Sequence, residues 1–159
     1  MRRALVLGCL ALAALDITDA ILFWYFYRGV MPMRIFHSVA AGLLGRDAAI
    51  RGGLPTALLG AALHVFIASC IVLTYFLASR WLPTLTRHPF VYGPLYGIAV
   101  WLVMTFVVVP LSAAAGKGGP MPLPVLLNGV VGHMLFVLVN LSRGPAGDND
   151  AARHQRPRR

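Results

Sequence analysis

Long apolar runs, separated by short polar or proline- and glycine-containing segments, dominate the pattern of this chain. Four such runs cover residues 4–27, 54–79, 90–113 and 123–141, with approximate ends. Each has about 20 residues or more, and a helix of that length crosses a hydrocarbon core of ~30 Å. The pattern therefore predicts an all-α membrane protein, a four-transmembrane-helix bundle formed by residues 1–141.

The first connection, residues 28–53, is the only long one between the predicted spans. Within it, residues 33–45 place apolar side chains along one helical face with basic side chains beside them, which is typical of a short interfacial helix. After the fourth run, residues 142–159 are polar and basic without an apolar period, which predicts a disordered tail. The apolar face of the interfacial helix comprises Ile35, Phe36, Val39, Leu43 and Leu44, beside Arg34, His37 and Arg46.

The N-terminus combines features of a signal peptide and of a membrane span. Arg2 and Arg3 precede an apolar stretch, as they would in a signal peptide. The apolar run resumes after Asp19, however, and its total of roughly 24 residues is long enough to cross a bilayer. We therefore expect the first helix to be retained in the membrane.

Composition and charge support membrane placement. Hydrophobic residues make up 58% of the chain and charged residues 12%, with a mean hydropathy of +0.75. The net charge of +9 lies at the ends of apolar runs and in the tail, unlike the basic surface of a nucleic-acid-binding protein, so nucleic acid is not an expected partner. Nine arginines fall on one side of the predicted spans and five basic residues on the other, which favours cytoplasmic termini. Cys9 and Cys70 lie in apolar runs and indicate no disulfide framework.

Four ionisable residues fall inside the predicted spans, where each costs several kcal/mol and is a functional candidate. His64 and His133 each lie ten residues after the start of their runs, so both imidazoles are expected ~15 Å deep, near the midplane. Asp16 and Asp19 reach a similar depth in the first run and, three residues apart, are expected to share a helix face. The sequence therefore predicts one polar layer formed by these four side chains.

Small residues at helical spacing indicate that this layer faces the inside of the bundle, because such stripes mark close helix contacts in membranes. The stripe beside His64 comprises Ala57, Gly60, Ala61 and Ala68, and further glycines are Gly93, Gly97, Gly129 and Gly132. The third run has no ionisable group, and its candidate lining residues are Tyr96, Trp101 and Thr105. Pro110 removes a backbone hydrogen bond there and is expected to kink the helix or to expose the carbonyl of Phe106.

Three interpretations of the polar layer stay open. In the first, carboxylates and imidazoles hydrogen-bond each other and fix the helix register. In the second, they relay protons or a small solute, as intramembrane Asp and His often do. In the third, His64, His133 and Asp16 hold a metal such as Zn, Mn or Fe(II), or the two histidines hold haem, although no cofactor is expected. The leading hypothesis is a membrane protein that handles protons or a small solute.

No sequence motif indicates an enzyme. The chain has no Walker loop, no G-x-S-x-G elbow and no H-E-x-x-H segment. His37, His88 and His154 fall in predicted loops or the tail, where an exposed imidazole is expected. Besides the lipid bilayer, a second copy of the chain is an expected partner, because four short helices are few for an enclosed path.

Residues 61–137 resemble the YagU-like family of small bacterial inner-membrane proteins. The resemblance rests on "LHVFIASCIVLTYFLAS", "YGPLYGIAVWLVMTFVVVPLS", a proline-rich loop and "LLNGVVGHMLF". Its most specific points are His64, the Tyr96-Gly97 pair, Pro110-Leu111 and Gly132-His133. The resemblance implies a bacterial inner-membrane location and the predicted fold, and it implies no reaction.

Overall fold

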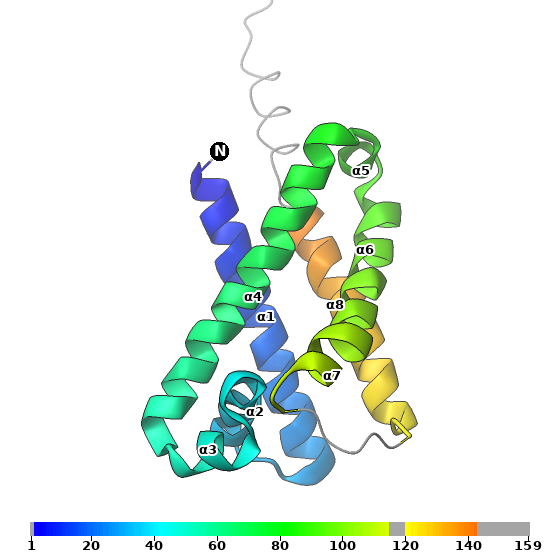
Figure 1. The fold of residues 1–159 in the computed structure, drawn as a ribbon. Helices are drawn as coiled ribbons and strands as arrows, with labels where there is room; N and C mark the ends of the chain where they lie inside the picture. The colour runs from blue at the N-terminus through cyan, green and yellow to red at the C-terminus, as the bar shows by residue number, and fades with distance from the viewer. Residues whose placement is uncertain (1, 115–119, 143–159) are drawn as a thin grey trace, which may run out of the picture.

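A computed structural model describes residues 2–114 and 120–142, and these residues fold into helices joined by short connections (Figure 1). The all-α prediction is therefore confirmed. The predicted tail lies, beyond Ser142, outside the described residues. The elements in chain order are α1 (Arg2–Arg28), α2 (Pro32–Leu44), α3 (Arg46–Arg51), α4 (Gly53–Trp81), α5 (Thr84–Arg87), α6 (Pro89–Val103), the π-helix η1 (Met104–Val108), α7 (Val109–Leu111) and α8 (Leu123–Ser142).

The long helices run alternately in opposite directions, with α1 descending, α4 rising, α6 descending and α8 rising in the view of Figure 1. Within residues 2–114 and 120–142, three segments are long and apolar enough to cross a membrane, namely Leu5–Arg28, Gly53–Trp81 and Pro89–Leu111. The segment Leu123–Leu138 of α8 is also apolar but shorter. Many large hydrophobic side chains of these helices are exposed, among them Phe26, Phe66 and Phe106, as expected where lipid is the solvent. The chain is a membrane-embedded helical protein.

Helices α6 and α8 pack closely because glycines bring their backbones together. A Cβ added at Gly97 would collide with the backbone of His133 and Met134, and one added at Gly93 would come within 3.2 Å of the Cα of Leu138. Gly93 and Gly97 are one helical turn apart and both are buried. In lipid, where apolar side chains gain little from leaving the solvent, such close backbone contact is a main source of helix association.

The stripe of small residues predicted on α4 also mediates helix packing. Ala57, Gly60 and Ala68 are buried. Ala68 belongs to a core cluster with Leu12, Ala13 and Val137, so this part of the stripe joins α4 to α1 and α8. At Gly60 an added Cβ would collide with the backbone carbonyl of Phe36 in α2. The stripe therefore packs against α2 at Gly60, near its beginning, and against α1 and α8 at Ala68, its last residue.

The predicted short helix between the first two spans is present as α2, and the residues of its apolar face differ in exposure. Leu43 and Leu44 are 62% and 41% exposed, whereas Ile35, His37, Ala40 and Ala41 are buried. The close crossing at Gly60 explains the difference, because it accepts only small side chains between the two backbones. The leucines are consequently turned outward.

Polar contacts with two other segments, the chain after α7 and α4, hold α2 and α3 in place at one end of the bundle (Figure 1). The Ala113 amide donates to the Gly42 carbonyl at 2.9 Å, and Arg46 Nε donates to the Ala114 carbonyl at 3.2 Å. Thr56 Oγ1 donates to the Ala49 carbonyl at 2.5 Å, which ties α3 to α4. The chain that follows α7 is thus fastened to α2 and α3.

Pro110 disturbs the third long segment as predicted, and the disturbance takes the form of a π-turn. Proline has no amide hydrogen, so it cannot bond to the carbonyl of Phe106. The turn before it widens into η1, in which the amide of Val109 bonds to Met104, five residues earlier. Single π-turns within α-helices often lie at functional sites. Here the widened turn directs Val108 and Val109 toward α2 and the cavity described below.

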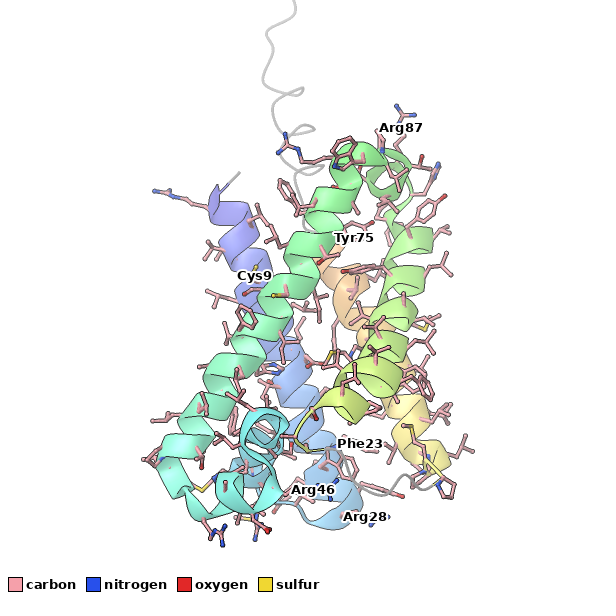
Figure 2. All side chains as sticks on the ribbon, in the orientation of Figure 1. Cys9, Phe23, Arg28, Arg46, Tyr75 and Arg87 are labelled. Atoms are coloured by element: carbon pink, nitrogen blue, oxygen red, sulfur yellow. The ribbon has the colours of Figure 1, made fainter. Side chains whose placement is uncertain are left out.

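Arginine side chains mark both ends of the bundle. Arg28 and Arg46 lie at the end formed by α2 and α3, and Arg87 lies at the opposite end, beside α5 (Figure 2). Lys117 and the five tail arginines that enter the orientation count fall outside the described residues. The predicted orientation therefore remains a prediction.

We predict that Gly60→Val destabilises the protein by about 1–3 kcal/mol, the usual cost of overpacking, because the valine side chain would push α2 away from α4. The measurement is the free energy of unfolding of purified protein in mixed detergent micelles. Ala62→Val, at an exposed position two residues later, is the matched control and should unfold like the wild type. Equal stability of the two variants would contradict the crossing.

Candidate functional site

A cavity of ≈ 790 Å³ lies between α1, α2, α4, the η1–α7 segment and α8. Its walls are largely aliphatic, with Trp24 and Phe136 as the aromatic members. Six charged or titratable side chains also line it: Asp16, Arg34, His37, Arg46, His64 and His133. Polar groups on a mainly apolar concave surface are the usual composition of a small-molecule site.

Asp16 and His64 meet across α1 and α4. His64 Nε2 lies 2.9 Å from the backbone carbonyl of Ala13 and 3.8 Å from Asp16 Oδ2. Because a carbonyl can only accept, Nε2 carries the hydrogen, and in the neutral ring Nδ1 is the proton acceptor. The distance to Asp16 exceeds hydrogen-bond range and leaves an electrostatic contact. The imidazole is 12% exposed and the carboxylate 35%, so both retain access to the cavity.

His133 lies on α8 at its closest approach to α6. Its Nδ1 donates to the carbonyl of Gly129 in its own helix at 2.8 Å. In the neutral ring, Nε2 is then the proton acceptor. The backbone of His133 faces Gly97, so the glycine contact fixes the position of this histidine along the bundle. His133 thus presents a titratable ring to the cavity from a rigid helix pair.

Asp19, unlike the other three residues of the predicted layer, is not among the residues that line this cavity. Its Oδ2 accepts a hydrogen bond of 2.8 Å from Asn128 Nδ2 and lies against Gly132 of α8. Asp19 and Asn128 line a second, smaller hollow with aromatic side chains of α1. Three residues along a helix correspond to a rotation of about 60° from the same face. That rotation turns Asp16 toward α4 and Asp19 toward α8. The two carboxylates, which were predicted to share a helix face, therefore contact different helices.

His37 and Asn128 are among the polar residues that line the two hollows without having been predicted as site residues. The prediction of an exposed His37 was wrong: the residue is 5% exposed, and its Nε2 lies 2.9 Å from the Gly53 carbonyl at the start of α4. His37 Nδ1 has no hydrogen-bond partner among the described residues. The sequence signal for the burial of His37 is that Ala40 and Ala41 follow it by three and four residues, so His37 shares a helix face with small residues. For Asn128, the signal is a side-chain amide within an apolar run.

The three candidate lining residues from the third span are not among the residues that line this cavity. Tyr96 donates its hydroxyl to the Ile71 carbonyl at 2.8 Å and packs on Tyr75. Trp101 lies against Gly129 and meets Phe106 edge to face, and Thr105 belongs to η1. The cavity wall on this side is formed instead by Val100, Met104, Val108 and Val109.

Metal binding by His64, His133 and Asp16 remains a prediction from the sequence. Within residues 2–114 and 120–142, no three His, Cys, Asp or Glu side chains are grouped as metal ligands. His64 and His133 each direct one ring nitrogen to a backbone carbonyl. The arrangement therefore provides separate proton acceptors around a cavity.

Comparison with known proteins gave no match to a family model, a curated protein or a solved structure. The resemblance to the YagU-like family is neither supported nor refuted by these comparisons and remains an expectation from the sequence.

We predict that His37→Ala loosens α2 from the start of α4, because the bond from His37 Nε2 to the Gly53 carbonyl is lost. A cysteine at Ala40, which is fully buried, would report the change through its rate of maleimide labelling in a Cys9→Ser, Cys70→Ser background. Labelling should be at least about tenfold faster in the His37 variant, which corresponds to roughly 1.4 kcal/mol of local opening. His88→Ala, at an exposed position, is the control, and equal rates would contradict the role of His37.

We predict a coupling free energy of about 1 kcal/mol between Asp19 and Asn128, in the range of hydrogen bonds between membrane helices. The measurement is a double-mutant cycle of Asp19→Leu and Asn128→Leu, followed by unfolding in detergent. The matched cycle of Asp16→Leu with Asn128→Leu should give no coupling, since Asp16 faces α4. Equal coupling in both cycles would show that the carboxylates are not divided between the two neighbours.

Proposed function

We propose that this chain is a small four-span protein of the bacterial inner membrane that takes up protons or a small solute in the cavity between its helices. The observation that carries the proposal is that Asp16, His64 and His133, from three different long helices, line one cavity. Ionisable groups at this depth are expensive to keep, and they usually mark ion or substrate pathways.

The four-span arrangement rests on α8 and on helix direction. α8 has 20 residues and is apolar over Leu123–Leu138, so we take it as the fourth crossing. An even number of crossings leaves both termini on one side, and the arginine count favours the cytoplasm. The α2–α3 end then lies at the opposite interface, with α2 as the interfacial helix. The inner-membrane location rests on the resemblance to the YagU-like family alone.

The chemistry of the three groups suits proton exchange. Each histidine donates one ring hydrogen to a backbone carbonyl and, when neutral, keeps its second nitrogen as an acceptor. Asp16 Oδ2 lies 3.8 Å from His64 Nε2, beyond hydrogen-bond range, so the two side chains lie next to each other on the cavity wall without a hydrogen bond between them.

A purely structural layer is the second candidate, and one observation favours it. The bond from His64 to the Ala13 carbonyl already joins α4 to α1. Buried polar groups need such partners whatever their use. If this is their whole role, removing the imidazole should cost stability and leave transport unchanged.

We predict that the wild-type protein, reconstituted in liposomes, increases proton flux under an imposed membrane potential. His64→Gln, His133→Gln and Asp16→Asn should each lower that flux at least about tenfold, because each removes a protonatable group that lines the cavity. The measurement uses a trapped pH-sensitive dye with potassium and valinomycin. His88→Gln, exposed at the opposite end, should retain the wild-type flux.

Two results would contradict the proton proposal. The first is a wild-type flux equal to that of protein-free liposomes. The second is unchanged flux in all three cavity variants, which together with a reduced free energy of unfolding would leave the structural role.

A further inference from the structure

Two arginines give one end of the cavity a positive charge. Arg34 of α2 and Arg46 of α3 both line it, and both are exposed, so the cavity reaches the protein surface at these residues. Trp24, near the end of α1, lines the same region. Asp47, which follows Arg46, is exposed and is not among the lining residues. The two guanidinium groups are therefore the charges nearest to anything that enters here.

The opposite end of the cavity is apolar. It is bounded by Leu12, Ile71 and Val137, with Ala68 beside them. Along α1 the lining extends from Trp24 to Leu12, twelve residues, or ~18 Å at 1.5 Å per residue. The volume of ≈ 790 Å³ is within the range of ligand pockets. The cavity is thus elongated, charged at one end and apolar at the other.

The charge of Asp16 inside the cavity also determines the orientation of a bound anion. Asp16 lines the cavity eight residues from Trp24, ~12 Å farther from the arginine end. An anionic head group would be repelled by this carboxylate and attracted by Arg34 and Arg46. Guanidinium groups bind carboxylates and phosphates through paired hydrogen bonds. Among the described residues, the hydrogen bond of the Arg46 side chain is the one from Nε to the Ala114 carbonyl, and the proposal uses its terminal nitrogens.

We propose that the occupant of this cavity is a single-chain amphipathic anion, a long-chain carboxylate. Its head group lies at the arginine-lined end of the cavity, bound by Arg34 or Arg46, and its chain follows α1 past Trp24 toward Leu12. This inference rests on the proposed function, because it names the class of solute that the cavity would take. Asp16, His64 and His133 then lie beside the chain and are separated from the head group by about two helical turns.

Bromine atoms on an acyl chain quench tryptophan fluorescence at short range, and Trp24 lines the proposed path. The experiment titrates the full-length protein in detergent with dibromostearate at pH 8, with its uncharged methyl ester as the comparison. The quenching that disappears in Trp24→Phe is assigned to the cavity, because Trp81 and Trp101 remain in that variant. We expect the acid to half-saturate this component at least about tenfold below the ester, which corresponds to ~1.4 kcal/mol for the head group.

The arginines are tested by variants at exposed positions. Because Arg46 Nε also donates to the Ala114 carbonyl, only variants whose free energy of unfolding equals that of the wild type are used. Arg34→Gln with Arg46→Gln should remove the preference for the acid, and Arg34→Lys with Arg46→Lys should largely retain it. Arg51→Gln, at the same end but not among the lining residues, is the matched control and should behave as wild type.

Three outcomes would overturn the inference. Equal quenching by acid and ester would mean that the cavity accepts any acyl chain. Quenching by a phospholipid with brominated chains, without a response to the free acid, would identify a bilayer lipid as the occupant. Absence of the Trp24 component with every probe would exclude an acyl ligand. In each case the proton-flux experiment decides the proposed function separately, since its variants leave both arginines unchanged.

Discussion

The close crossing of α2 over α4 at Gly60 is the contact on which the rest of the arrangement depends. Because Gly60 has no side chain, the backbone of α2 rests against α4, and His37 then reaches the Gly53 carbonyl. The same placement lets Gly42 accept the amide of Ala113, which fastens the chain after the π-turn. α2 thereby forms one wall of the cavity and supplies its charged end. A larger residue at position 60 would affect the site as well as the packing.

The sequence predicts the long helices well because lipid imposes a simple rule. An α-helix forms all of its backbone hydrogen bonds within one segment, as the hydrocarbon core requires, so each long apolar run predicts a helix. Within the resulting bundle, stripes of small residues predict which faces meet, and Gly60, Ala68 and Gly97 all lie at helix contacts. Which helix each stripe meets depends on tertiary arrangement. The partner of Gly60 is α2, and hydrophobic periodicity alone does not identify it.

The candidate site can be predicted only in part from the sequence, because it too depends on the tertiary arrangement of the helices. Depth in the membrane follows from counting residues, so His64 and His133 are expected near one another along the bundle axis, and both line the same cavity. The rotation of each helix about its axis depends on the neighbouring helices, and in α1 it directs Asp16 toward α4 and Asp19 toward α8. His37 was expected to be exposed because it lies in a connection, yet the small-residue face buries it. Apolar moments indicate burial less reliably where tight packing favours alanine over leucine.

The two carboxylates of α1 show how structure and function can be separated within one helix. Asp19 accepts a hydrogen bond from an amide on α8 and lies against a glycine, an arrangement that fixes both helices. Asp16 stands 3.8 Å from an imidazole whose nearer contact is a backbone carbonyl. The proposed function assigns the binding of a proton or a ligand to Asp16, which lines the cavity beside the His64 ring.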